Sequence, residues 1–390
     1  MEELSPRSVM QTAVRPPMIM VSGEGSWLVD SNGKRYLDFV QGWAVNCLGH
    51  CAPVVVDALA RQSRLLINPS PAFYNVGMLE LANLITHYSE LDRVFFCNTG
   101  AEANEGAIKL ARKWGQIHKN GAFQIITFDN SFHGRTLATM SASGKAQWTT
   151  LFEPKVPGFI KVPFNRIEAV ESVITDQCVA IMLELVQGEG GVIPADPEFI
   201  DQLQQLAKSR SLLLIIDEVQ TGVGRTGPLF CFQRYGIQPD IFTLGKGLGG
   251  GVPLAALVAS ESVAVFAPGD QGGTYNGNPL MTAVGVGVLK TVADPKFLEL
   301  SHAMSIYLVQ TLQTMSDRFG LSGTRGMGLL QALILNSDDA STIVSVAMER
   351  GLLLNAPRPD IIRFMPSLVV SKEEIDLMAE ILSKILSDIF

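Results

Sequence analysis

The stretch LLLIIDEVQ, Leu212–Gln220, places five apolar residues directly before two adjacent carboxylates. A short apolar run of this length is typical of a strand that is buried on both faces of a sheet. A charge at the end of such a strand is unfavourable unless it has a partner. Asp217 and Glu218 therefore mark the end of this strand as a candidate site.

Similar apolar runs elsewhere in the chain predict more buried strands, at 94–97, 124–128, 179–183, 241–244 and 254–259. Asp196 and Pro197 are a typical helix start, and apolar residues recur at helical spacing after them. These apolar positions are Phe199, Ile200, Leu203, Leu206 and Ala207. The resulting β-α-β unit predicts an α/β fold with a mostly parallel central sheet and helices on both faces. Ligands of such folds bind beyond the carboxyl ends of the strands.

The length of 390 residues predicts more than one lobe, because domains average roughly 150 residues. Residues 50–290 are predicted to form a large ligand-binding domain. From about Asp294 amphipathic helices follow, and Ser371 and Glu374 form a capping box before the last one, so residues 291–390 are predicted to form a small domain. The turn at Asp30–Gly33 predicts a hairpin, and residues 1–49 are expected to pack with the small domain.

Composition excludes several classes of function. The net charge is −8 and no run of basic residues is present, which argues against nucleic-acid binding. No apolar stretch approaches the roughly 20 residues needed to cross a membrane, and no signal peptide is recognisable, so we expect a cytoplasmic protein. Five cysteines without paired spacing argue against a disulfide framework. Cys47, His50 and Cys51 form a single cluster, and we expect no metal site.

Three polar features follow predicted strands and would meet at one edge of the sheet. Asp217 ends one strand, and Lys246 follows another in the glycine-rich TLGKGLGGG. Poor solvation of a lysine lowers its pKa and makes it a plausible nucleophile for forming an imine. Gly100 and Ala101 begin a helix, whose free N–H groups suit a phosphate. An acid for a ring nitrogen, an imine-forming lysine and a phosphate site are what pyridoxal phosphate requires.

Motifs in this order, over nearly the whole chain, resemble those of the class III (subgroup II) pyridoxal-phosphate-dependent aminotransferases, and within them the acetylornithine enzymes. The motifs are GEGSWLVDSNGKRYLDF (23–39), VFFCNTGAEANEGAIKLARK (94–113), FHGRT (132–136), QGEGGV (187–192), LLIIDEVQTGVGRTG (213–227), TLGKGLGGGVPL (243–254), TYNGNPL (274–280) and IIRFMPSL (361–368). The resemblance implies fold type I with a smaller α+β lobe. It also implies transfer of the δ-amino group of N2-acetylornithine to 2-oxoglutarate, giving N-acetylglutamate semialdehyde and glutamate, in arginine biosynthesis.

The resemblance also implies roles around the cofactor. Lys246 would form the imine and then move a proton, and Asp217 would bind the pyridine nitrogen. Val219 would pack against the ring, Gln220 would reach its phenolic oxygen, and Phe132 would stack on the opposite face. Gly100 and Ala101 would hold the phosphate.

Thr274 would reach the phosphate of a neighbouring subunit, which implies a homodimer with shared active sites.

Substrate contacts are implied in the same way. Arg363 would grip an α-carboxylate, and Glu189 would pair with Arg363 when no α-carboxylate is bound. Arg135 is similar to an arginine that binds substrate in acetylornithine enzymes, and Glu184 would support the site. Two positions and the stretch Asn68–Asn75 depart from the family. Leu185 stands where proline is usual, and Gly273 replaces a Ser or Thr near the substrate, which leaves the N-acyl preference open.

Other functions stay open at this point. Ornithine, succinylornithine and 4-aminobutyrate aminotransferases share the fold and the cofactor. The segment GVGRTG, Gly222–Gly227, fits a dinucleotide-binding pattern and keeps an NAD-dependent oxidoreductase as a remote alternative, although Pro228 and Gly236 leave little room for the helix that should follow. A non-catalytic binding module would not need a buried lysine opposite an acid.

Overall fold

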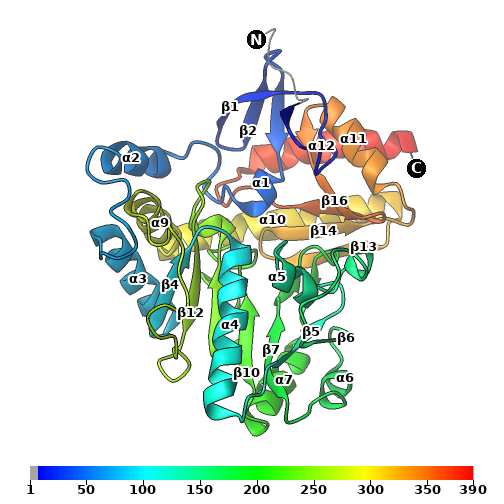
Figure 1. The fold of residues 1–390 in the computed structure, drawn as a ribbon. Coiled ribbons are helices and arrows are strands. Elements are labelled where there is room, and N and C mark those ends of the chain that lie inside the picture. The colour runs from blue at the N-terminus through cyan, green and yellow to red at the C-terminus, as the bar shows by residue number, and fades with distance from the viewer. Residues whose placement is uncertain (1–7, 390) are drawn as a thin grey trace.

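The computed structural model describes residues 8–389, and its central element is a seven-stranded sheet with the order β4-β12-β11-β10-β7-β5-β6 (Figure 1). The strands are β4 (Arg93–Cys97), β5 (Gln124–Phe128), β6 (Phe159–Val162), β7 (Cys178–Leu183), β10 (Leu213–Asp217), β11 (Ile241–Leu244) and β12 (Ala255–Ala259). Four of the six neighbouring pairs are parallel, and only β12 runs antiparallel to its neighbours. The predicted sheet is confirmed, and the edge strand β6 was not predicted.

The two faces of this sheet are covered by different helices. Leu213 and Ile215 of β10 pack in the cluster that contains α4 (Gly100–His118), while Leu214 and Ile216 pack in the cluster that contains α7 (Pro197–Ser209). This alternation follows from the two-residue period of a strand. The buried side of α7 consists of the five apolar residues predicted for it.

The C-terminal part of the chain combines helices with a second sheet, of order β13-β14-β17-β16. Its strands are β13 (Gly323–Met327), β14 (Leu330–Ile334), β16 (Asn355–Arg358) and β17 (Ile361–Phe364), and its helices are α10 (Pro295–Phe319), α11 (Ala340–Glu349) and α12 (Lys372–Ile389). The predicted capping box is present, because Ser371 N–H donates to Glu374 and Glu374 N–H donates back to Ser371. Leu386 is buried on α12, whereas Ile389 near its end is exposed.

The N-terminal hairpin pairs with a short strand of the C-terminal part. Strands β1 (Met20–Glu24), β2 (Trp27–Asp30) and β3 (Arg35–Asp38) form an antiparallel sheet whose edge pairs in parallel with β15 (Leu352–Leu353). At the turn, the Asp30 carboxylate accepts hydrogen bonds from the N–H groups of Asn32 and Lys34. The domain borders at 49/50 and 290/291 stay predictions.

Three helices that were not predicted from the sequence pack together beside β4: α2 (Pro53–Gln62), α3 (Val76–Ser89) and α9 (Pro279–Val292). The remaining elements are short. They are α1 (Gln41–Ala44), α5 (Leu137–Ala142), η2 (Ala146–Trp148), α6 (Ile167–Glu171), β8 (Val186–Gln187), β9 (Ile193–Pro194), α8 (Phe232–Tyr235) and η3 (Lys246–Leu248).

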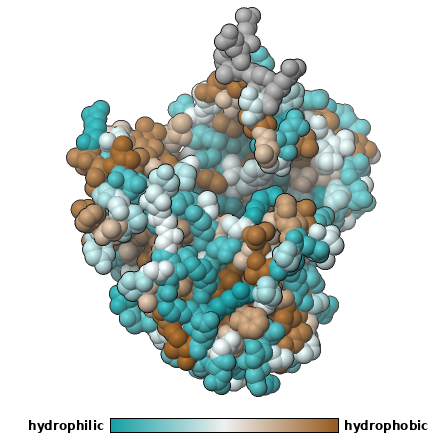
Figure 2. Space-filling model, viewed as in Figure 1, coloured by the Kyte–Doolittle hydropathy of each residue, from teal (hydrophilic) through white to brown (hydrophobic). Residues whose placement is uncertain are grey.

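The surface is hollowed between the part that carries β1 and β2 and the part that carries α4 and α5 (Figure 2). Within residues 8–389, no helix combines the length and the apolar character needed to cross a membrane.

Candidate active site

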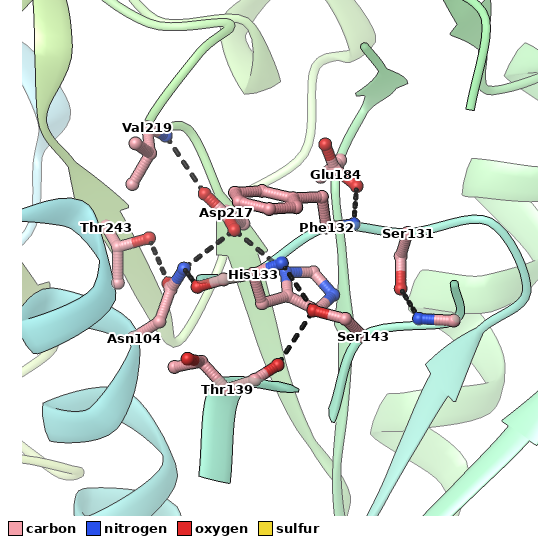
Figure 3. A network of polar contacts seen from close by, with 11 residues as sticks. Asn104, Ser131, Phe132, His133, Thr139, Ser143, Glu184, Asp217, Val219 and Thr243 are labelled. Carbon is pink, nitrogen blue, oxygen red and sulfur yellow. Dashed lines mark hydrogen bonds and ion pairs between the residues drawn. The ribbon is translucent and has the colours of Figure 1, made fainter. Parts of the chain in front are cut away.

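The carboxyl ends of neighbouring strands bring the predicted polar residues to one edge of the central sheet. Asp217 ends β10, and Lys246 follows β11, which pairs with β10 in parallel. Phe132 follows β5, and Glu184 follows β7. The Glu184 carboxylate accepts a hydrogen bond of 2.9 Å from the Phe132 N–H (Figure 3). The location beyond the strand ends is the one expected for this class of fold.

Asp217 is held by three nitrogen donors. Its Oδ1 accepts from the N–H of Val219 at 3.0 Å, and its Oδ2 accepts from Asn104 Nδ2 and from His133 Nδ1, both at 2.8 Å (Figure 3). The residue is only 3% exposed. A carboxylate offers about four acceptor positions, so about one stays free for a ligand N–H.

The donors to Asp217 are themselves fixed. Asn104 lies on α4, accepts from Thr243 Oγ1 at 2.7 Å and donates to the carbonyl of His133 at 2.7 Å. No role was predicted from the sequence for Asn104, His133 or Thr243. The signal for Asn104 was available, because it lies on the apolar stripe of α4 between Ala103 and Ala107, where a polar residue needs a buried partner.

His133 is fully buried beside Asp217. Burial alone would lower the pKa of its imidazole, but the hydrogen bond and the negative charge of Asp217 outweigh burial and raise that pKa. Its Nε2 has no hydrogen-bond partner among the described residues. The imidazole therefore restrains Asp217 through Nδ1.

Glu218, the second carboxylate of the opening stretch, has a different task. It is 1% exposed and accepts from the N–H groups of Cys231 at 2.8 Å and Phe232 at 2.7 Å. Burial raises the pKa of this carboxyl to about 8, although the two backbone hydrogen bonds oppose the shift. Glu218 thus fixes the start of α8.

Lys246 occupies a strained position at the start of η3. Its φ is +41°, a backbone region that non-glycine residues rarely adopt and that often occurs at functional sites. Its charged neighbours are Asp217, Arg363, Glu189 and Glu184. Exclusion of water lowers the pKa of its amine, and the negative charge of Asp217 opposes that shift. A lysine with a lowered pKa is a better nucleophile and base near neutral pH.

The first turn of α4 leaves two donors available. Thr99 and Glu102 form a capping box that takes up the N–H groups of Asn98, Thr99 and Glu102. No described residue accepts from the N–H of Gly100 or Ala101, which are the two residues predicted to hold a phosphate. A Cβ on Gly100 would lie 2.5 Å from Val219, so only glycine allows Val219 to approach the helix start.

Arg363 and Glu189 form an ion pair between β17 and the segment after β8. Arg363 lies on β17 and is fully buried; its Nη2 lies 2.8 Å from Glu189 Oε1, and its Nε donates to Asn355 at 2.9 Å. Its Nη1 has no partner among the described residues. Burial raises the pKa of Glu189, but Arg363 and Lys145 outweigh burial and hold that pKa at about 2.

Gln220 lies close to Arg363. Its Oε1 is buried and has no partner among the described residues. A Cβ on Gly188 would lie 1.7 Å from this oxygen and 3.3 Å from Arg363 Nη1, so the glycine makes room for both groups.

An aromatic cluster stands beside this ion pair. The rings of Phe132 and Trp148 lie 5.7 Å apart, and Lys145 Nζ lies 4.8 Å from the first ring and 5.3 Å from the second. The predicted substrate residue Arg135 is exposed, with its guanidinium 5.3 Å from the Trp148 ring. Arg135 therefore contacts Trp148, and the Trp148 ring lies beside Phe132 and Lys145. Lys145 in turn pairs with Glu189.

Thr274 and Gly273 are not brought to Lys246 within one chain. Both lie exposed in the loop between β12 and α9. A Cβ on Gly273 would lie 2.7 Å from the amide of Asn276, which accepts from Asn98 at 3.1 Å. Gly273 therefore has no side chain that would clash with Asn276, and Asn276 connects this loop to Asn98, just before α4.

The dinucleotide-like segment GVGRTG is structural. Only the four residues of α8 follow it as a helix, whereas a dinucleotide fold needs a long helix with a free start. Arg225 is 2% exposed and donates to the carbonyl groups of Leu329 and Pro366 in the C-terminal part. The segment therefore joins the two parts of the chain.

The unused groups of the site fit pyridoxal phosphate. Asp217 has a free acceptor position for a pyridinium N–H, Gln220 has an unpaired amide oxygen, and α4 offers two N–H groups. The Lys246 amine lies among these groups. A ring with a phosphate on one side and a protonated nitrogen on another is a chemical match to this set.

Comparison with known proteins gives consistent results. A family model described as aminotransferase class-III matches residues 9–386. The acetylornithine aminotransferase of Ralstonia nicotianae is 58% identical over 387 residues, 97% of each chain. A structure of N-acetylornithine aminotransferase from Stenotrophomonas maltophilia superposes with a TM-score of 0.85 at 34% identity, covering 96% of this chain and 97% of the other. A structure of ornithine aminotransferase from Toxoplasma gondii, described with partial occupancy of PLP at its active site, has a TM-score of 0.92 at 33% identity and coverages of 97% and 92%.

Proposed function

The chain belongs to the class-III aminotransferases, and we propose that it uses pyridoxal phosphate to transfer the δ-amino group of N2-acetylornithine to 2-oxoglutarate. The products would be N-acetylglutamate semialdehyde and glutamate, a step of arginine biosynthesis. The observation that carries the chemistry is the placement of Lys246 and Asp217 at the carboxyl ends of adjacent strands, next to the start of α4. The substrate is supported by the name of the 58% identical relative.

Six side chains and two backbone groups would hold the cofactor. Gly100 and Ala101 would donate their N–H groups to its phosphate, which the helix start stabilises by about 0.3 to 1 kcal/mol per favourable charge. The side chains are those of Lys246, Asp217, Val219, Gln220, Phe132 and, from a neighbouring subunit, Thr274. When bound, pyridoxal phosphate supplies an electron sink for the carbon that loses its proton.

Lys246 and Asp217 would divide the chemical work. The lowered pKa of the Lys246 amine lets it accept a proton from the carbon that carries the amino group and return that proton one step later. Asp217 would keep the pyridine nitrogen protonated through a charge-assisted hydrogen bond. Its fixation by Val219, Asn104 and His133 means that it need not reorganise when the reaction begins.

Two arginines would recognise the carboxylates of the substrates. Arg363 has an unpaired Nη1 beside the Nη2 that binds Glu189, so a carboxylate that displaces Glu189 would meet two parallel N–H donors. We assign Arg363 to the α-carboxylate of 2-oxoglutarate. Arg135, exposed beside Trp148, is assigned to the carboxylate of the acylated donor.

A homodimer in the cytoplasm is part of the proposal. Exposed aromatic residues lie near the Thr274 loop, namely Phe73, Tyr74 and Tyr275. Asn75 connects the two segments, because its side-chain amide donates to the Gly277 carbonyl at 2.7 Å. Large exposed apolar groups of this kind are typical of an interface.

The experiment is a single-turnover panel followed by the absorbance of the bound cofactor. N-acetylornithine, N-succinylornithine, ornithine and 4-aminobutyrate are each mixed with the holoenzyme. We expect N-acetylornithine to react fastest. If only ornithine or 4-aminobutyrate reacts, the proposed donor is wrong, and ornithine is the second candidate because a solved ornithine aminotransferase shares the fold at 33% identity. Lys246→Ala serves as the control and should not react with any donor.

A further inference from the structure

The carboxylate of Glu189 lies between two cations. Its Oε1 is 2.8 Å from Arg363 Nη2, and its Oε2 is 2.7 Å from Lys145 Nζ. Glu189 is 26% exposed and Lys145 is 21% exposed, whereas Arg363 is buried. The family resemblance accounts for the pairing with Arg363 and assigns nothing to Lys145.

Lys145 is held where it is by its backbone and by two rings. Lys145 follows Gly144, which is hydrogen-bonded to the loop after β5. The Gly144 carbonyl accepts from Asn130 N–H at 2.9 Å, and the Gly144 N–H donates to the Ser131 carbonyl at 3.1 Å. Its ammonium group lies within 5.3 Å of the ring centroids of Phe132 and Trp148. Cation–π contacts of this length stabilise an ammonium group, so Lys145 can stay in place when its anionic partner moves.

A conflict of charges arises when a substrate carboxylate binds Arg363. Glu189 occupies Arg363 Nη2, so the incoming carboxylate displaces it from that donor. A partly buried carboxylate without a cation is unfavourable. Lys145 already binds the other oxygen of Glu189, so this pair can remain when the bond between Glu189 and Arg363 is broken.

We propose that Lys145 is the second partner of the Glu189 switch: it keeps Glu189 paired while Arg363 binds the α-carboxylate of the dicarboxylate acceptor. Lys145 is then a positioning residue for the acceptor half of the reaction and touches neither substrate. The donor half, in which Glu189 stays on Arg363, does not use it. This inference rests on the proposed assignment of Arg363 to the α-carboxylate.

The test compares Lys145→Gln with the unchanged holoenzyme. We expect the dissociation constant for 2-oxoglutarate to rise about tenfold, which equals about 1.4 kcal/mol. Glutarate, an unreactive dicarboxylate, is titrated by calorimetry as a readout that needs no turnover, and its binding should weaken to the same extent. The apparent affinity for N-acetylornithine should change by less than about twofold, because donor binding leaves the Glu189–Arg363 pair intact.

Three further variants make the outcome decisive. Lys145→Arg keeps a cation and should restore acceptor binding. Lys384→Gln removes the same charge from an exposed i,i+4 pair on α12 and should have no effect. In a Glu189→Gln background, Lys145→Gln should no longer weaken glutarate binding, because the carboxylate that Lys145 serves is absent.

Two results would overturn the inference. Weaker binding of the donor but not of glutarate would show that Lys145 contacts the donor directly. Equal losses with and without Glu189 would show that Lys145 acts on the acceptor itself. If the donor panel rejects N-acetylornithine while glutarate binding responds as expected, the proposed donor fails and the role of Lys145 stands.

Discussion

Asp217, which is buried, and Glu189, which is partly buried, are carboxylates that this protein stabilises in different ways. Asp217 is 3% exposed and accepts from a backbone N–H, an amide and an imidazole, each fixed by its own surroundings. Glu189 is 26% exposed and binds two long cationic side chains, one on each oxygen. The first arrangement permits no exchange of partners, whereas the second leaves one cation in place when the other is taken. A fixed acid suits a permanent cofactor, and an exchangeable one suits alternating substrates.

Of the variants that test this comparison, Asp217→Asn should have the largest effect on kcat/KM. An amide NH2 group would face the N–H donors that now converge on the carboxylate, and it could not stabilise a protonated ring nitrogen. We expect kcat/KM to fall by about 10² to 10³, the size typical of losing a preorganised electrostatic partner. Steady-state kinetics at saturating cofactor measures the loss.

Asp240→Asn is the matched control for that variant. Asp240 is a partly buried carboxyl that accepts from Leu214 N–H at the opposite end of the same sheet. Its replacement should leave kcat/KM close to that of the unchanged enzyme. An equal loss in both variants would mean that Asp217 acts through stability rather than through the reaction.

Glu184→Gln should change the pH dependence of stability. Burial raises the pKa of Glu184 from 4.5 to about 7 in the folded protein, so the folded state holds a proton that the unfolded chain releases above pH 4.5. The stabilisation is fully present below about pH 4.5 and is lost as the pH rises to about 7, by on the order of 3 kcal/mol. Glutamine can still accept from Phe132 N–H but does not titrate.

Urea unfolding at pH 5 and pH 8 measures this difference. The unchanged protein should lose more stability between the two values than Glu184→Gln does. Equal losses of stability in the two proteins would contradict the raised pKa of Glu184.

Glu189→Gln should have the smallest effect. Removing the negative charge weakens the competition for Arg363, so 2-oxoglutarate should bind up to about tenfold more tightly, or about 1.4 kcal/mol. The preference for the δ-amino donor over glutamate should decrease at the same time, because Arg363 no longer carries a counter-charge when the donor binds. Separate measurement of the two half-reactions distinguishes these effects, and unchanged affinity for 2-oxoglutarate would contradict the switch.

Several parts of the fold could be predicted because their cause is local. The apolar run before Asp217 forms β10, the residues after Asp196 bury the predicted face of α7, and Ser371 and Glu374 cap α12. The family motifs also pointed to Lys246 and Asp217 as the centre of the site. Each of these predictions depends on residues that are near one another in the chain.

The sequence by itself thus determined the buried strands, the amphipathic helices and the identity of the charged residues, since apolar spacing and capping act over a few positions. Only the tertiary structure decided which charges meet. Asn104 lies 113 positions from Asp217, and Arg363 lies 174 positions from Glu189. The different tasks of Asp217 and Glu218 were also invisible in the sequence, because successive side chains point in different directions and find partners from distant elements. The choice of partner for a buried charge depends on the packing of the whole chain, which no local pattern encodes.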